Sequence, residues 1–474
     1  MTIKPLGRVP FFALGAGLSV LKVAADFGIA RAFGRPFSLL YYVSPIDAPL
    51  FHPGDNTRFY AAMWACALPF IAVGVWLTAR RLVDAALSPF LALLFFAPFA
   101  NLLFFALASI APPRPMSAPP QGMPPQDAYR QSGQPVTMTA PSRSPGAVLF
   151  MSAGLGTVIG LGALALSVGV FKEYGAALML GAPTISGFAT GAFYARLDPA
   201  GIYKRAALAT FITCTLTMAV LMVFALEGAI CLVMAFPLLV IPAFVGSYIG
   251  FAMARSVGAR SMPGAIAASV LLLPAVFALE HVSPLPPLAP PPVMTEIIVD
   301  APPERVFPNV VRVSEIPAPT ETLFLVGVSY PLRATLDDDR VGATRRCEFN
   351  TGTAMETVTR YEPPITRGGL PVAGHFAFHI DSQPDPLREQ TLYHTVRQPH
   401  LDGYVRNQEG IFDLEPLPGG KTRVRAQSIY TVAIGPETYW RLWTDASIHA
   451  IHGRVLEHIK RESEGRGVKS LASR

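Results

Sequence analysis

The stretch TEIIVDAPPERVFPNV, from Thr295 to Val310, decides the fold of the C-terminal part of the chain. Its first residues alternate in polarity, as in a strand with one buried face, and the Asp-Ala-Pro-Pro run then ends that strand. The rest has the apolar spacing of a short amphipathic helix. A second stretch, YWRLWTDASIHAIHGRVLEHIK from Tyr439 to Lys460, carries an apolar stripe at helical spacing. It predicts a long last helix from Pro436 to about Ser463.

The segment between these two stretches alternates in the manner of β-strands. The predicted order is a strand at 294–300, a helix at 303–312, and strands near 328–336, 342–350, 353–361, 373–381, 408–415 and 421–434, before the last helix. Strands that follow one another in this way pair antiparallel, and helices cover one face of such a sheet. The sequence therefore predicts an α+β module.

The remainder of the chain, residues 1–292, has the composition of a membrane protein. The whole chain is 51% hydrophobic and only 15% charged, which is too apolar for an ordinary soluble protein. Lys and Arg outnumber Asp and Glu by 8 in residues 1–292, whereas residues 293–474 have a net charge of −2. Because the basic surplus lies in the membrane half, it indicates orientation in a bilayer and does not support a nucleic-acid partner.

A membrane-spanning helix needs about 20 mostly apolar residues. Seven stretches meet this length, and Val9–Ile29 is an eighth that contains two charges, Lys22 and Asp26. Eight spans is the prediction and seven is the alternative. We expect a multi-pass protein of a bacterial inner membrane, with a terminal module that the loop charges favour on the side away from the cytoplasm. The seven stretches are Phe59–Thr78, Phe90–Ile110, Ala147–Val170, Ala176–Ala195, Ala207–Leu226, Ile230–Ala254 and Gly264–Leu279.

Several motifs of the terminal module resemble the START and Bet v 1-like superfamily (SRPBCC), which includes polyketide cyclases and lipid-transfer proteins. The resemblance implies a helix-grip fold, in which a curved sheet wraps the last helix and leaves an apolar cavity. It does not imply one reaction, because such folds serve unrelated functions. The motifs are the opening IIVDAPPERVF, the segment RVGATRRCEFNTG at Arg340–Gly352, the Tyr361-Glu362-Pro363 step, the hairpin FDLEPLPGGKTRVRAQSIY and the last helix.

The N-terminal part is similar to a small bacterial membrane family, DUF805. The similarity lies in Arg80-Arg81-Leu82-Val83-Asp84 and in the span that follows, FLALLFFAPFANLLFF. It implies membrane class only. The predicted domains are 1–111, DUF805-like; 112–146, a Pro-rich linker; 147–282, a second transmembrane block; 283–293, a Pro-rich linker; 294–464, the helix-grip module; and 465–474, a disordered tail.

The sharpest constellation of polar residues is Asp445-x3-His449-x2-His452, which places three side chains on one face of the last helix. A metal ion needs such convergence, but no further ligand follows at helical spacing, and a carboxylate such as Glu356 could complete the set only from the sheet. We therefore predict neither a metal nor a cofactor. The histidines are interpreted as structural or as contacts for a ligand's polar group.

Apolar residues of the same helix predict its packing face and, in a helix-grip fold, the wall of the cavity. This stripe consists of Trp440, Trp443, Ile448, Ile451, Val455 and Ile459. Cys347 could be a nucleophile, but strand alternation places it on one face with Arg345 and Phe349, which favours a buried small residue. No catalytic residue is assigned. The candidate cavity residues are Trp440, Trp443, Asp445, Ile448, His449, His452 and Glu356.

Three functions fit this sequence. The leading one is a non-catalytic binding module, anchored in a bilayer, that takes up a lipid or other hydrophobic small molecule for carriage or sensing. The second is a cyclase- or hydrolase-like enzyme that uses Asp445, His449 and His452 as acid and base. The third is a membrane scaffold that binds a protein partner. An open apolar interior favours the first, an open interior lined by the histidines the second, and an interior filled by side chains the third.

Overall fold

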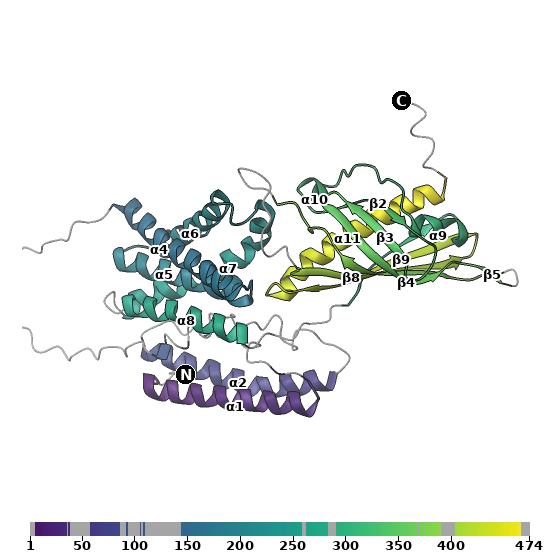
Figure 1. Cartoon of the computed structure of the whole chain (residues 1–474). Coiled ribbons are helices and arrows are strands. Elements are labelled where there is room, and N and C mark those ends of the chain that lie inside the picture. Colours follow the sequence, from purple (N-terminus) through teal and green to yellow (C-terminus); the bar gives the residue numbers. More distant parts are fainter. Residues whose placement is uncertain are drawn as a thin grey trace, which may run out of the picture. The chain divides into compact units, whose positions relative to one another are not determined.

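The structure, a computed structural model, describes residues 5–35, 37, 57–85, 92, 105, 108–109, 144–257, 262–282, 291–367, 370–389 and 403–465 (Figure 1). The chain forms two compact units. One comprises Met1–Met218 and Pro237–Leu285, and the other comprises Ala219–Phe236 and Pro286–Arg474. Two helices are divided between the units, because the second unit includes the end of the helix Tyr203–Val223 and the beginning of the helix Ala229–Val257.

The first unit is helical. Its helices are α1 (Arg8–Ala32), α2 (Thr57–Asp84), α4 (Pro145–Leu166), α5 (Ala182–Leu197), α6 (Tyr203–Val223), α7 (Ala229–Val257) and α8 (Met262–Val282), with π-helical turns η6 (Ser167–Phe171) and η7 (Ala177–Gly181). Within the described ranges, six helices are long and apolar enough to cross a membrane, namely α1, α2, α4 with η6, α6, α7 and α8. The predicted class of a multi-pass membrane protein is confirmed.

The other predicted spans have different outcomes. The stretch Ala176–Ala195 forms η7 and α5, and α5 is buried along almost its whole length. The stretch Phe90–Ile110 lies outside the described residues, apart from four isolated positions, so the choice between eight and seven spans stays a prediction. Most of the two Pro-rich linkers and nearly all of the tail also lie outside them.

Helices α5 and α7 touch through their backbones. A Cβ on Gly187 of α5 would stand 1.9 Å from the carbonyl oxygen of Ala243, and the same close approach recurs at Gly191. On α7, Gly246 and Gly250 lie equally close to the backbone of α5. Both helices therefore use a glycine every fourth residue, which is how membrane helices pack tightly without a hydrophobic driving force.

The two charges within α1 neutralise each other. Lys22 donates a hydrogen bond to Asp26 one turn later, and Asp26 is 2% exposed. Pairing removes much of the cost of charge within a span, so Lys22 and Asp26 are compatible with α1 as a membrane helix.

The C-terminal module forms most of the second unit, and its strands form a curled antiparallel sheet in the order β1-β9-β8-β7-β4-β3-β2 (Figure 1). The predicted α+β architecture with a long last helix is confirmed. Strands β5 and β6 form a separate two-stranded sheet. The elements are β1 (Val293–Val299), α9 (Pro303–Val311), α10 (Thr322–Leu325), β2 (Pro331–Leu336), β3 (Thr344–Phe349), β4 (Gly352–Glu362), β5 (Thr366–Arg367), β6 (Leu370–Pro371), β7 (Gly374–Ser382), β8 (Val405–Leu417), β9 (Lys421–Val432) and α11 (Glu437–Ser463).

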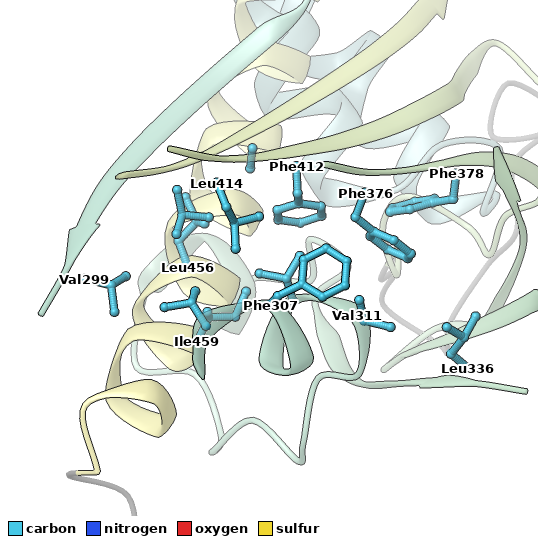
Figure 2. Packing of buried hydrophobic residues seen from close by; sticks show 14 of the residues in the cluster. Val299, Phe307, Val311, Leu336, Phe376, Phe378, Phe412, Leu414, Leu456 and Ile459 are labelled. Atoms are coloured by element: carbon cyan, nitrogen blue, oxygen red, sulfur yellow. The ribbon is translucent and has the colours of Figure 1, made fainter. Parts of the chain in front are cut away.

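Alternation along the strands builds the core. Every second residue of β9, from Thr422 through Val424 and Ala426, is buried toward α9 and α11, while the residues between them are half-exposed. Figure 2 shows the rings of Phe307, Phe376 and Phe412 meeting between the sheet and these two helices. We call this set of buried residues the main core cluster. It also includes Val299, Val311, Leu336, Phe378, Leu414, Leu456 and Ile459.

Candidate functional site

The β3–β4 hairpin brings two opposite charges together on the inner face of the sheet. Phe349 pairs with Gly352 across the turn, so Arg345 pairs with Glu356 four residues along each strand. Glu356 in turn pairs with Ile380 on β7. These last three residues form one row across β3, β4 and β7.

Arg345 and Glu356 form a buried ion pair. Nη1 of Arg345 donates to Oε2 of Glu356 at 2.5 Å, and its Nε donates to the carbonyl oxygen of Val311 at 3.2 Å. The guanidinium carbon lies 4.7 Å from the ring centroid of Phe378 and 5.7 Å from that of Phe376. Arg345 is 3% exposed and Glu356 is 4% exposed. The pair is therefore enclosed by aromatic and backbone groups.

This location is electrostatically expensive. Burial raises the pKa of the Glu356 carboxyl, and the Arg345 guanidinium opposes that shift. Removing two ions from water costs several kcal/mol for each, and the attraction between them offsets this cost only partly. A buried pair of this kind therefore need not stabilise the fold. Glu356 and Val311 accept two of the five N–H groups that a guanidinium can donate. The pair therefore places two charged groups inside an apolar interior.

Two apolar side chains that pack against the main core cluster remain partly open to solvent. Ile380 and Val455 of α11 both pack against the main core cluster, and both are only half-buried. Val455 also packs against a smaller cluster that includes Cys347 and Ala354. Val455 is therefore a half-buried apolar side chain where the two clusters meet on α11.

Three of the predicted candidates, Asp445, His449 and His452, hydrogen-bond to the strands β1 and β9. His452 is bonded through Nδ1 to Thr295 of β1 at 3.1 Å and through Nε2 to Ser428 of β9 at 2.9 Å. His449 is bonded through Nδ1 to Thr295 at 2.8 Å. Asp445 accepts a hydrogen bond from the hydroxyl of Tyr430, also on β9. These residues connect the last helix to two strands of the sheet.

This network does not include Glu356. Among the described residues, no hydrogen bond joins Glu356 to Asp445, His449 or His452, so the structure divides the predicted candidates between two places. Burial, with the nearby His449, lowers the pKa of His452 to about 4. Both ring nitrogens of His452 are thus occupied by hydrogen bonds to β1 and β9. The described residues include no cluster of three or more His, Cys, Asp or Glu that could hold a metal ion.

The apolar stripe of α11 is narrower than predicted. Trp440, Ile448 and Ile459 are buried, at 7%, 6% and 0% exposure. Trp443 is 37% exposed, so its assignment to the packing face was wrong. The reason is geometric, because five residues at about 100° each place Trp443 about 140° around the helix from Ile448.

The prediction for Cys347 is confirmed. The thiol is 8% exposed and shares its strand face with Arg345 and Phe349. Burial raises its pKa to about 12, which does not suit a thiolate nucleophile. Arg345 was missed as a site residue, although the turn of the hairpin places it opposite Glu356.

Comparisons with known proteins give structural likeness only. No model of a known protein family matches this chain, and no curated protein matches it. Solved structures that resemble it include a protein from Nitrosospira multiformis, at 20% identity over 37% of this chain and 99% of that chain, with a TM-score of 0.23. A protein from Mesorhizobium loti matches at 14% identity over 36% and 96% of the two chains, with a TM-score of 0.21. The human StarD13 lipid transfer and protein localization domain matches at 12% identity over 35% and 75%, with a TM-score of 0.18. Likeness at these levels assigns neither a family nor a function to this chain.

Proposed function

We propose that the C-terminal module binds an amphiphile, meaning a lipid or another hydrophobic small molecule with a polar group, for carriage or sensing at a membrane. The observation that carries the proposal is the buried ion pair of Arg345 and Glu356, which shares a row of the sheet with the half-buried Ile380. Val455 of α11 is half-buried against the same core cluster. The membrane helices of the same chain anchor the module in the proposed bacterial inner membrane.

The chemistry of this site matches an amphiphile at both ends. A guanidinium and a carboxylate side by side can donate to and accept from one hydroxyl, carbonyl or phosphate group, so they hold a polar head without transforming it. Ile380 and Val455 offer apolar surface to the attached chain. Burial of such surface is worth roughly 25 cal/mol per Å². A ligand that uses both features would cover exposed apolar area and hydrogen-bond to the ion pair.

A scaffold function is the second candidate, because the main core cluster fills the interior around α9. A protein with a filled interior needs no ligand there. The two candidates differ in whether purified protein carries a small molecule.

The experiment compares three forms of the full chain in lipid nanodiscs. The first is the wild type, the second carries Arg345→Met with Glu356→Leu, and the third carries Arg333→Met with Glu348→Leu. The third form is a matched control, since Arg333 and Glu348 form a solvent-accessible ion pair at 2.9 Å in the same sheet. Each form is extracted, and co-purifying molecules are identified by mass spectrometry.

An amphiphile is expected with the wild type and the control and absent from the variant that lacks the buried pair. Equal retention by all three forms would locate the ligand elsewhere in the chain. Absence of any specific molecule from all three would favour the scaffold function.

The roles of the membrane segments are part of the same proposal. The six-part division of the chain, including a DUF805-like domain at 1–111, is proposed as the arrangement that anchors the module. The lipid bilayer and a hydrophobic small molecule are the proposed partners.

A further inference from the structure

The C-terminal module contacts the first turn of α7 within the second compact unit. Glu389 is 0% exposed, and its carboxylate accepts hydrogen bonds from the backbone N–H groups of Ile230 at 3.2 Å and Cys231 at 2.8 Å. Gly228 makes room for this carboxylate, since a Cβ there would stand 2.0 Å from Oε2 of Glu389. The first N–H groups of a helix have no partner within it, so Glu389 satisfies two of them.

Two further contacts surround this carboxylate. The hydroxyl of Tyr439, on the first turn of α11, donates to the carbonyl oxygen of Met234. Gly327, just after α10, lies against Ile230, because a Cβ there would stand 2.9 Å from Cδ1 of Ile230. Three separate segments of the module therefore meet the same end of α7.

That end of α7 is also the end of a membrane span. The candidate span is Ala229–Ser256, and Met234 lies five residues into it, which is about 8 Å along a helix axis. A position about 8 Å from the end of a span lies near the boundary between lipid headgroups and acyl chains, where Tyr and Trp are enriched. Since α7 and α8 are consecutive spans, the chain leaves α8 at Val282 on the membrane face where α7 starts. The connection to the module therefore agrees with these contacts.

Large apolar side chains are exposed at the same segments. Leu442 is 65% exposed and Trp443 is 37% exposed, and they follow Tyr439 by three and four residues on the same face of α11. Leu325 and Val326 directly precede Gly327 and are 65% and 48% exposed. We call these four residues the apolar rim. Exposed side chains of this size, gathered beside the end of a span, indicate a partner that is itself apolar.

We propose that the apolar rim is a membrane-docking surface, whose Leu325, Val326, Leu442 and Trp443 enter the headgroup and upper acyl region of the bilayer beside the start of α7. Glu389 and Tyr439 hold the module in this position. The lipid surface is the partner because the contacts that locate the rim lie on a membrane-spanning helix. This inference does not depend on ligand binding at Arg345 and Glu356, and it is tested separately.

The test uses the full chain in lipid nanodiscs, with its four cysteines replaced and a spin label introduced at Leu442→Cys. The matched control is a label at Val341→Cys, since Val341 is apolar, 56% exposed and located in the turn between β2 and β3. Collision of each label with oxygen, which concentrates in lipid, is compared with collision with a water-soluble nickel complex. We expect oxygen to dominate at Leu442 and the nickel complex to dominate at Val341. In a variant that combines Glu389→Ala with Tyr439→Phe, the ratio of oxygen collisions to nickel collisions at the Leu442 label should fall at least severalfold, toward the ratio at Val341.

A label at Leu442 that the nickel complex reaches as readily as it reaches Val341 would overturn the proposal. A second measurement needs no cysteine replacement and applies even if the cysteine-free chain fails to fold. The emission of Trp443 is obtained as the difference between the wild type and Trp443→Phe, in nanodiscs with and without lipids brominated near the headgroup. Quenching by the brominated lipid supports the proposal, and quenching only by an aqueous quencher contradicts it.

Discussion

Substitutions of Arg345 and Glu356 should separate the contribution of the buried ion pair to folding stability from its role in ligand binding. Glu356→Leu alone leaves the Arg345 guanidinium, 3% exposed, without its carboxylate, and breaking a buried pair in this way costs about 3–5 kcal/mol. The remaining bond to Val311 and the rings of Phe376 and Phe378 favour the lower end of that range. Arg345→Met should cost less, because the Glu356 carboxyl, whose pKa burial already raises, can take up a proton and become neutral.

The double variant gives the opposite result. Arg345→Met with Glu356→Leu replaces two buried ions by apolar side chains, a change that is often neutral or stabilising by about 1–4 kcal/mol. The assay is hydrogen–deuterium exchange of the β3 and β4 amides in the full chain, which reports the free energy of opening of these strands. We expect slower or unchanged exchange in the double variant, together with loss of the co-purifying amphiphile. If the double variant lost as much free energy of opening as the two single variants together, the reasoning would be refuted, because the ion pair would then make a net stabilising contribution to the fold.

Four further predictions follow from the same structure. Leu456→Ala, at a residue 1% exposed, should cost about 2–5 kcal/mol in a denaturant titration, whereas Trp443→Ala, at 37% exposure, should cost under about 1 kcal/mol. Burial lowers the pKa of His452 to about 4, so the folded state is at a disadvantage wherever this histidine must take up a proton. The free energy of unfolding should be unaffected above about pH 6.5 and should fall by up to about 3 kcal/mol as the pH approaches 4. His452→Gln should flatten this pH dependence, measured as the melting temperature. The fragment from Pro292 to Glu464 should fold as a soluble monomer, as gel filtration and circular dichroism would show, and an insoluble or molten product would place the boundary elsewhere. Basic residues at the end of α5, the start of α6 and the end of α7 share one membrane face, so a reporter fused after Arg474 should be active only outside the cytoplasm; activity of a cytoplasm-specific reporter would reverse the topology.

Local patterns were sufficient to predict most of the terminal module. Alternation and helical spacing are properties of neighbouring residues, so they located the strands and α11 to within a few positions. The same alternation placed Cys347 beside Arg345 and Phe349. The ion pair was within reach as well, because a tight turn between Phe349 and Gly352 fixes the register of the hairpin and sets Arg345 opposite Glu356.

Other features depend on contacts that sequence patterns do not encode. Glu389 meets Ile230 across 159 residues, and nothing around Glu389 in the sequence distinguishes it from a surface carboxylate. Trp443 has the size and polarity of a core residue, and only its angle around α11 shows that it is exposed. His449 and His452 stood out by their spacing on the helix, but their role depends on Thr295 of β1 and Ser428 of β9, which no helical pattern identifies.

Direct mapping of a bound amphiphile tests the central claim most sharply. The full chain in nanodiscs is exposed to a trace of a photoactivatable amphiphile with the reactive group midway along its apolar chain, irradiated and analysed by peptide mass spectrometry. We predict labelling in β7 around Ile380 and in α11 around Val455, and its loss in the variant with Arg345→Met and Glu356→Leu. Labelling confined to α1 through α8, or unchanged in that variant, would contradict an amphiphile site inside the C-terminal module.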